Sequence, residues 1–280
     1  MSRNALNLFL LLVVAGLALL VYLQPGKQPV QNDRVRLTPV DVETLTELRL
    51  ERQGGDTLLF RREGGQWWLS SPHVVAANRF RVEQLLWWFT ARSASRYRVA
   101  GLALSQYDLE KPRAHLYAGN QMLAFGGHDS LQQRRYVLAG ESVYLVSDRD
   151  ASALFAQWDY FASPKLLPAG RRVMAIVIPG LGKVQRGERG WRYEGDKGPP
   201  SADAMQALAD RWASAQAVDV EGFELSVKGE ELLFRFDNGV PDLRYRVVRS
   251  DEGLLLVNPQ LKLAYRISDS QVQRLFNWSD

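Results

Sequence analysis

The residue types that carry catalysis are present, but they lack the spacings of known catalytic motifs. The three histidines, His73, His115 and His128, lie in turn-like or strand-like segments, and none belongs to a paired motif such as HExxH that binds zinc. The GxSxG pentapeptide of many serine hydrolases does not occur. The absence of cysteine excludes disulfides, thiolate metal sites and a cysteine nucleophile. We therefore expect no enzyme, no metal site and no cofactor.

Two other patterns resemble functional motifs only in part. Residues 179–183 end like a phosphate-binding loop, but Val177 replaces the required glycine and Val184 replaces the serine or threonine, so this segment is interpreted as a hairpin turn. Asp108 and Glu110 are close in sequence, but a glycosidase pair is defined by its separation in space. A carboxylate-dependent hydrolase of the cell envelope therefore stays as the less favoured alternative.

Aromatic and acidic residues indicate a binding surface instead. Because adjacent strand residues face opposite sides, we expect one of Trp67 and Trp68 to pack against a helix and the other to lie on the opposite face. Trp87 and Trp88 lie at the borders of an apolar helical stripe, and packing in the core is the favoured interpretation for these tryptophans. The candidate surface for a partner or ligand consists of Trp67, Trp87, Tyr107, Asp108 and Glu110.

The elements that must position these residues occur twice along the chain. Trp191 follows Trp68 by 123 residues, and Ser201 follows Asn78 by the same number. Asn78 and Ser201 are each a predicted helix N-cap, and each precedes apolar residues spaced i, i+3, i+4 and i+7. After Asn78 these residues are Val82, Leu85, Leu86 and Phe89, and after Ser201 they are Met205, Leu208, Ala209 and Trp212. After the helices the separation becomes 109, because Leu116, Leu123, Phe125 and Tyr136 match Leu225, Leu232, Phe234 and Tyr245. It then becomes 121 from Tyr144 to Tyr265.

Alternating strands surround each predicted helix, and short glycine-containing turns join them. In the first copy the predicted strands cover residues 47–51, 57–61, 66–69, 114–117, 121–125, 134–138 and 143–147. The predicted fold class is α+β, with an N-terminal transmembrane helix followed by two related antiparallel halves that arose by internal duplication. The predicted divisions are a signal anchor at 1–23, a linker at 24–39, a first repeat at 40–168 and a second repeat at 169–280.

The amino terminus has the composition of a membrane anchor. From Ala5 to Leu23 the chain has 19 residues without a charge, and as a helix they would extend roughly 28 Å, close to the thickness of the bilayer core. The run exceeds the apolar region of a cleaved signal peptide. We expect contact with the membrane through residues 5–23, a single-pass location in the bacterial inner membrane and a C-terminal domain in the periplasm. Since the net charge is only +4, no nucleic-acid partner is expected.

Several segments together resemble a bacterial family of unknown function, domain-of-unknown-function family 4340. They are residues 68–72, Asn78, the helix at 82–89, the Tyr-Asp-Leu-Glu-Lys-Pro run at 107–112, the Leu-Ala-Phe-Gly-Gly turn at 123–127, and residues 135–137 with 143–146. Family members commonly have Tyr-Gly-Leu where this chain has residues 107–109. The resemblance implies a singly anchored envelope protein encoded beside gliding-motility-type ABC transporter components, with no catalytic residues.

The predicted function is therefore a noncatalytic, membrane-anchored, extracytoplasmic binding or scaffold protein. Its implied partners are an ABC-type permease and the auxiliary subunit of that permease. The main alternative is an envelope protein that binds a glycan, lipid or peptide.

Overall fold

The computed structural model describes residues 34–278, except 130, 197, 224–226, 238 and 251–252. The predicted transmembrane span at 5–23 lies outside the described residues, as do most of the predicted linker and Leu225. Residues 47–147 supply the strands of one large sheet, and residues 173–267 supply those of a second. We call these the first and the second half.

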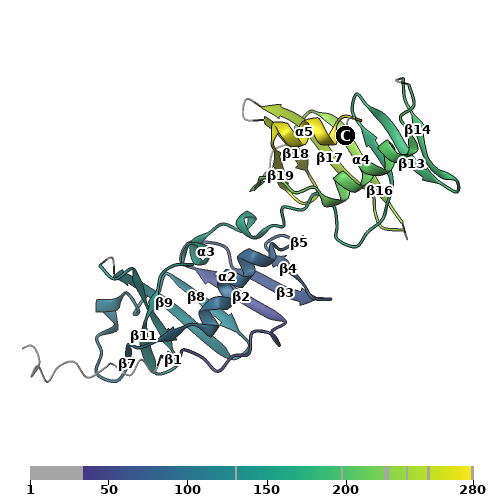
Figure 1. The fold of residues 1–280 in the computed structure, drawn as a ribbon. Helices are drawn as coiled ribbons and strands as arrows, with labels where there is room; N and C mark the ends of the chain where they lie inside the picture. Colours follow the sequence, from purple (N-terminus) through teal and green to yellow (C-terminus); the bar gives the residue numbers. More distant parts are fainter. Residues whose placement is uncertain are drawn as a thin grey trace, which may run out of the picture. The chain divides into compact units, whose positions relative to one another are not determined.

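The first sheet is antiparallel and has nine strands in the order β5-β4-β3-β2-β8-β9-β10-β11-β7 (Figure 1). Its strands are β2 (Glu47–Arg52), β3 (Leu58–Glu63), β4 (Gln66–Ser71), β5 (Val75–Ala76), β7 (Arg96–Arg98), β8 (Ala114–Ala118), β9 (Gln121–Asp129), β10 (Arg134–Ala139) and β11 (Ser142–Ser147). A separate two-stranded sheet pairs β1 (Val35–Arg36) with β6 (Arg92–Ser93).

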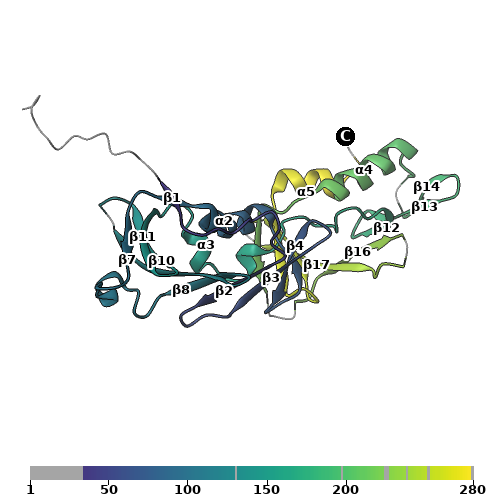
Figure 2. The same cartoon turned by 90° about the horizontal axis from the view of Figure 1, so that it is seen from below.

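One face of the first sheet is covered by α2 (Arg79–Thr90) and α3 (Ser152–Phe155), as Figure 2 shows. The predicted cap is confirmed, since the Asn78 side chain accepts a hydrogen bond from the Phe80 N–H at 3.1 Å. Val82, Leu85 and Phe89 are buried as their spacing predicts. Trp88 is also fully buried, with its ring 5.0 Å from that of Phe125 on β9. Side chains on alternate positions of the strands therefore point toward α2 and form the core.

The second sheet has eight antiparallel strands in the order β14-β13-β12-β16-β17-β18-β19-β15. Its strands are β12 (Val173–Ile178), β13 (Gly182–Gly187), β14 (Gly190–Glu194), β15 (Asp219–Gly222), β16 (Glu230–Phe236), β17 (Leu243–Ser250), β18 (Gly253–Asn258) and β19 (Leu263–Ile267). The segment at 179–181 is the turn between β12 and β13, which confirms its interpretation as a hairpin rather than a phosphate loop.

Two helices, α4 (Ala202–Ser214) and α5 (Asp269–Leu275), pack on the second sheet. Ser201 caps α4 as predicted, because its hydroxyl accepts the Ala204 N–H at 3.1 Å. All four residues of the predicted stripe, Met205, Leu208, Ala209 and Trp212, are buried. Before α5, Ser268 forms a capping box with Gln271.

The two halves share one strand order. The helix α2 matches α4. The strands before the helix, β2, β3 and β4, then correspond to β12, β13 and β14, and the strands after it, β8 to β11, correspond to β16 to β19. The segment between β7 and β8 covers residues 99–113, whereas the segment between β15 and β16 covers only 223–229, so the second half is shorter there. The predicted separation of 109 is wrong, however, because it matches Phe125 on β9 with Phe234 on β16, one strand too early. An alternating pattern repeats in every strand, so it cannot reveal a slip of one whole strand.

The predicted fold class, α+β with an N-terminal transmembrane helix, is wrong. The described chain is mostly β, with three antiparallel sheets. The helices were correctly located, but each half contains a single helix of three turns or more beside eight or nine strands. The short edge strands β5, β6 and β7 carry too little alternation to be recognised in the sequence.

The expected single-pass location in the inner membrane is also corrected. Among the residues that the structure describes, no helix is long and apolar enough to cross a membrane. That expectation rested on residues 5–23 alone, and the described structure contains no spanning helix to support it.

Candidate functional site

The face of the first sheet that points away from α2 carries exposed apolar side chains between charged ones. On β2, β3 and β4 the exposed residues alternate with core residues such as Leu48, Phe60 and Trp67. We call this surface the open face and define it by Glu47, Arg49, Glu51, Leu59, Arg61, Trp68, His115, Tyr117 and Met122. Leu59 and Trp68 are each 36% exposed, and Met122 is 37% exposed. Three exposed apolar side chains on one face make this face a candidate binding surface.

A row of four residues crosses the middle of the open face. The strand registers place Leu59 beside Arg49, Arg49 beside Tyr117, and Tyr117 beside Met122. The Arg49 guanidinium carbon lies 4.0 Å from the centre of the Tyr117 ring, a cation–π contact that holds the ring in place. The Tyr117 hydroxyl donates to Glu51 at 3.0 Å. Desolvation and this hydrogen bond raise the pKa of Tyr117 above its ordinary value, so the phenol stays protonated and remains a donor at neutral pH.

A groove of about 440 Å³ is lined by three of the four residues of this row. Arg49, Leu59, Arg61 and Tyr117 line it together with Thr44, Leu45 and Thr46 from the segment before β2. Arg61 lies 3.4 Å from Glu47, and Arg49 lies 3.4 Å from Glu51. The groove therefore offers an aromatic wall, an aliphatic wall and cations that are already balanced by neighbouring carboxylates, an arrangement suited to noncovalent binding.

The predicted tryptophans of the binding surface are not exposed on it. Trp67 is 4% exposed and belongs to the core, whereas Trp68 lies on the open face, so the expected division of this pair is confirmed. Trp87 is half-buried, and its ring meets that of Trp88 edge-on at 5.0 Å. Neither Trp67 nor Trp87 lines the groove.

The other three predicted residues lie together in the loop that contains the short 3-10 helix η1 (Leu104–Tyr107). Asp108 and Glu110 are exposed, while Tyr107 is half-buried and Leu109 is buried. Asp108 has a left-handed backbone with φ of 53°, a conformation that aspartate tolerates better than most residues. This conformation turns the chain so that Leu109 points inward between two exposed carboxylates.

The η1 loop docks on β9 at Gly126 and Gly127. A Cβ atom on Gly126 would overlap the carbonyl oxygen of Tyr107 and lie 2.8 Å from Cγ of Leu109. A Cβ atom on Gly127 would lie 2.9 Å from Oδ2 of Asp108. The two glycines thus allow a close backbone approach. Two motifs of the sequence, residues 107–112 and 123–127, therefore form one packed unit.

Tyrosines gather where this loop meets the sheet. The Tyr107 and Tyr136 rings lie 4.8 Å apart, and Tyr97 is 50% exposed. Burial is the largest cause that raises the pKa of Tyr136, followed by the negative charge of Asp129 and by Tyr107 and Tyr97. The cluster presents aromatic rings with hydroxyl tips, a combination common at protein interfaces.

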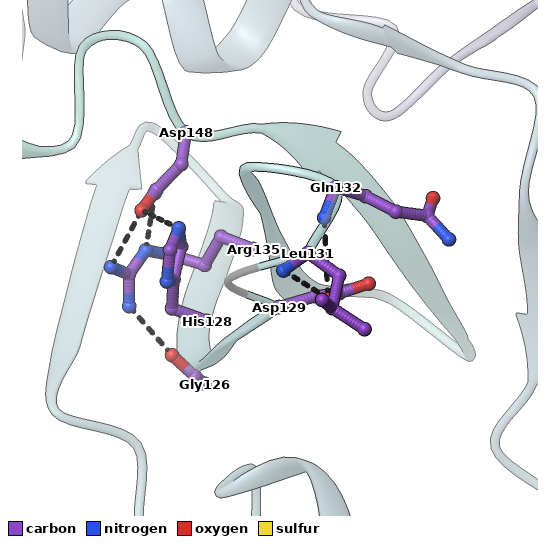
Figure 3. Close-up of polar contacts among 7 residues, drawn as sticks. All are labelled: Gly126, His128, Asp129, Leu131, Gln132, Arg135 and Asp148. Atoms are coloured by element: carbon purple, nitrogen blue, oxygen red, sulfur yellow. Dashed lines mark hydrogen bonds and ion pairs between the residues drawn. The ribbon is translucent and has the colours of Figure 1, made fainter.

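An ion pair supports β9 and β10 at their ends (Figure 3). Arg135 donates from Nε to Oδ1 of Asp148 at 2.6 Å and from Nη2 to Oδ2 at 3.0 Å, and its Nη1 donates to the Gly126 carbonyl at 2.8 Å. His128, beside Arg135 across the strands, places Nε2 3.3 Å from Oδ2 of Asp148. The Arg135 guanidinium also lies 5.1 Å from the centre of the Phe155 ring. The charges of Arg135 and Asp148 balance each other, and the bond from Arg135 to the Gly126 carbonyl holds Gly126 beneath the η1 loop.

The sequence pattern did not reveal this ion pair. Arg135 and Asp148 belong to different strand ends, and Arg135 is 7% exposed. The only signal for it in the sequence is a charged residue, Arg135, at an inward position of a strand with alternating side chains.

The other two histidines lie elsewhere, His73 with its ring 4.3 Å from that of Trp158 and His115 with its ring 6.1 Å from that of Tyr117. In the described part of the chain, no group of three or more His, Asp and Glu residues could hold a metal ion.

The second half shares the fold but not the ion pair. Asp269, which follows Asp148 by 121 residues, is exposed in the first turn of α5. Strand order matches β10 with β18, whose inward side chains include Leu254 and Leu256. The candidate site therefore belongs to the first half alone.

Comparison with known proteins identifies the family. Residues 67–224 match the family model described as Domain of unknown function (DUF4340). No curated protein and no solved structure matches the chain. The matched range includes Trp68, the η1 loop, the two glycines of β9 and the ion pair, and it covers more than half of the sequence. The chain therefore belongs to the family described as Domain of unknown function (DUF4340).

Proposed function

We propose that this chain is a noncatalytic binding module, accessory to an ABC-type transport system, and that the open face of the first sheet contacts its protein partner. The observation that carries the proposal is the row Leu59, Arg49, Tyr117 and Met122. Three of these side chains are apolar or aromatic, and the fourth is an arginine stacked on the aromatic ring. Aromatic residues, methionine and arginine are the types enriched at protein interfaces.

The partner class is inferred from the family resemblance. The resemblance to this family implies that the protein is encoded beside gliding-motility-type ABC transporter components. An ABC-type permease or its auxiliary subunit is therefore the proposed partner. The η1 loop supports this proposal because it adds a second exposed element, with Tyr107 and the carboxylates of Asp108 and Glu110, to the same face.

The test is co-purification of the full chain with these transporter subunits in mild detergent. Tyr117→Ala and Trp68→Ala each remove an aromatic ring from the open face, and we expect each to lower recovery of the permease at least about tenfold, as truncation of an interface hot spot does. Phe80→Ala is the matched control, because Phe80 is 62% exposed on α2, away from the open face. Recovery that is unchanged in both open-face variants, or lost equally in Phe80→Ala, would exclude this surface.

The groove supports a second candidate function, the binding of a glycan, lipid or peptide. Its volume of about 440 Å³ suits a small ligand, and Tyr117 offers a ring on which a sugar or side chain can stack. Arg61→Ala changes the groove lining without removing a side chain of the central row. Loss of small-ligand binding in Arg61→Ala, with normal recovery of the permease, would favour this alternative over the protein partner.

A further inference from the structure

The two related sheets differ at one edge. In the first sheet β5 covers the outer side of β4, with Ala76 beside Trp68 and Val75 beside Leu69. The Ala77 N–H then donates to the Trp67 carbonyl at 2.8 Å. In the second sheet β14 takes the place of β4 and is the last strand (Figure 1). The described chain supplies no strand that covers the outer side of β14.

The sequence between β14 and α4 explains this difference. The separation of 123 residues between the two helix caps, Asn78 and Ser201, also matches Val75, Ala76 and Ala77 with Gly198, Pro199 and Pro200. In the strands before the caps, the hairpin turns match Trp191 with Trp67 and not with Trp68. Proline has no N–H to donate to a neighbouring strand, and glycine disfavours the strand conformation. The segment that closes the edge in the first half is therefore replaced by one that cannot.

The free edge has unpaired backbone groups. The hairpin of β13 and β14 pairs Gly187 with Gly190 across a two-residue turn. In such a hairpin Gly190, Arg192 and Glu194 exchange hydrogen bonds with β13, so the N–H and C=O groups of Trp191 and Tyr193 point outward. No described residue hydrogen-bonds to these outward groups. They form a template for one more antiparallel strand.

Side chains along β14 define what the added strand would carry. Trp191 and Tyr193 are half-buried, while Arg192 is exposed and has no ion-pair partner among the described residues. Glu194, in contrast, already accepts from Lys183 at 3.0 Å and from Gln185 at 2.8 Å. A carboxylate directly opposite Arg192 would supply the missing charge, and small apolar residues on either side of it would repeat the positions of Val75 and Ala77 in the first half.

We propose that β14 accepts an extended, acidic segment of a partner protein as an additional antiparallel strand. Main-chain hydrogen bonds to Trp191 and Tyr193 provide the affinity, and the charge of Arg192 selects a segment with an Asp or Glu between small apolar residues. The site belongs to the second half and does not depend on the open face of the first.

A second copy of this chain fits the edge less well. Five residues of β14 alone bury far less than the roughly 1,200–2,000 Å² of a stable interface. The only acidic side chain that a second β14 would bring is Glu194, and it is already bound to Lys183 and Gln185. An independent segment can bring a free carboxylate.

The experiment uses the full chain and two capped synthetic peptides, Ser-Val-Asp-Val-Ser and Ser-Val-Lys-Val-Ser. Amide hydrogen exchange is followed at each residue of β14 by NMR. The acidic peptide should slow exchange of the Trp191 and Tyr193 amides and leave that of Arg192 unchanged, and it should bind about five-fold more tightly than the basic peptide. Arg192→Glu should reverse this preference. Arg189→Glu, in the exposed turn of the same hairpin, makes the same charge change without facing the added strand and should leave the preference unaltered.

A second variant tests whether the edge is equivalent to that of β4. Gly198→Val, Pro199→Ala and Pro200→Ala together restore a segment like β5, so the Trp191 and Tyr193 amides should exchange slowly without peptide, and the acidic peptide should lose its effect. Fast exchange in this triple variant would overturn the proposal. It would also be overturned if the wild-type Trp191 and Tyr193 amides are already protected, if the two peptides act equally, or if sedimentation shows a dimer that Arg192→Glu dissociates.

Discussion

Arg135 binds both carboxylate oxygens of Asp148 and, with its remaining Nη1 group, the backbone carbonyl of Gly126. The side chains of Arg135 and Asp148 are only 8% and 13% exposed. The pair joins the ends of β9, β10 and β11, so its geometry controls the strand on which the η1 loop rests. A desolvated ion pair therefore holds the part of β9 on which the η1 loop rests.

Removing one member of this pair should destabilise the protein more than removing both. Arg135→Met leaves the Asp148 carboxylate without its principal partner, and we expect the free energy of unfolding to fall by about 3–5 kcal/mol. The double variant Arg135→Met with Asp148→Leu leaves no uncompensated charge and should recover part of this loss. Urea denaturation of the two variants measures the difference. His128→Gln is the control, because His128 touches only the rim of the pair, and equal losses in Arg135→Met and His128→Gln would contradict this account.

Gly126→Ala should displace the η1 loop. The added methyl group would overlap the Tyr107 carbonyl and press on Leu109, so we expect a loss of about 1–3 kcal/mol in the free energy of unfolding. Chemical shifts of the amides at 104–112 should change with it. Gly55→Ala is the matched control, since its new methyl group would meet nothing closer than the Arg52 side chain at 3.4 Å. Unchanged shifts at 104–112 in Gly126→Ala would show that the loop is not docked on β9.

Local elements of this fold were predictable because local physics determines them. The predicted caps Asn78 and Ser201 are correct because each side chain bonds an N–H within three residues. Strand segments were correct where side chains alternate between core and solvent, as in β2 and β3. These signals lie within a few residues of one another.

Long-range relationships were not predictable in the same way. β2 pairs with β8 across the whole α2 segment, and the pairing of β10 with β9, which places His128 beside Arg135, contains an irregularity between Arg135 and Val137. No single-sequence pattern encodes such a register. The family motifs supplied Tyr107 and Gly126 as separate landmarks, but their contact depends on a close backbone approach. The predicted fold class was wrong because the strands pair into sheets of nine and eight strands, each with one longer helix, so the described chain is mostly β.

The α4 cap provides a test of local stability. Ser201→Ala removes the hydroxyl that accepts the Ala204 N–H, and we expect it to cost about 1 kcal/mol in the free energy of unfolding. Ser201→Asp keeps an acceptor and adds a negative charge at the positive end of the helix dipole, so it should cost nothing measurable. Thermal and urea unfolding of both variants check this. Equal losses in the two variants would mean that the hydroxyl acts through packing rather than capping.

Tyr245 should make the protein sensitive to alkali. Its side chain is 1% exposed, its hydroxyl donates to the Leu166 carbonyl, and burial raises its pKa well above 10. Below pH 10 the phenol is protonated in both the folded and the unfolded chain, so this group adds no pH dependence. Above pH 10 the unfolded chain loses the proton first, which favours unfolding by about 1.4 kcal/mol per pH unit until the folded pKa is reached.

Tyr245→Phe separates these two effects. At pH 8 it should lower the free energy of unfolding by about 1 kcal/mol, because the hydrogen bond to Leu166 is lost. Between pH 10 and pH 11.5 its stability should fall less steeply than that of the wild type, so the two curves converge. Tyr265, whose pKa burial also raises, keeps some dependence in both proteins. Tyr97→Phe removes the hydroxyl of a tyrosine that is 50% exposed and is the matched control for the loss of stability at pH 8. Parallel curves for Tyr245→Phe and the wild type would show that the Tyr245 phenol ionises as readily in the folded chain as in the unfolded one.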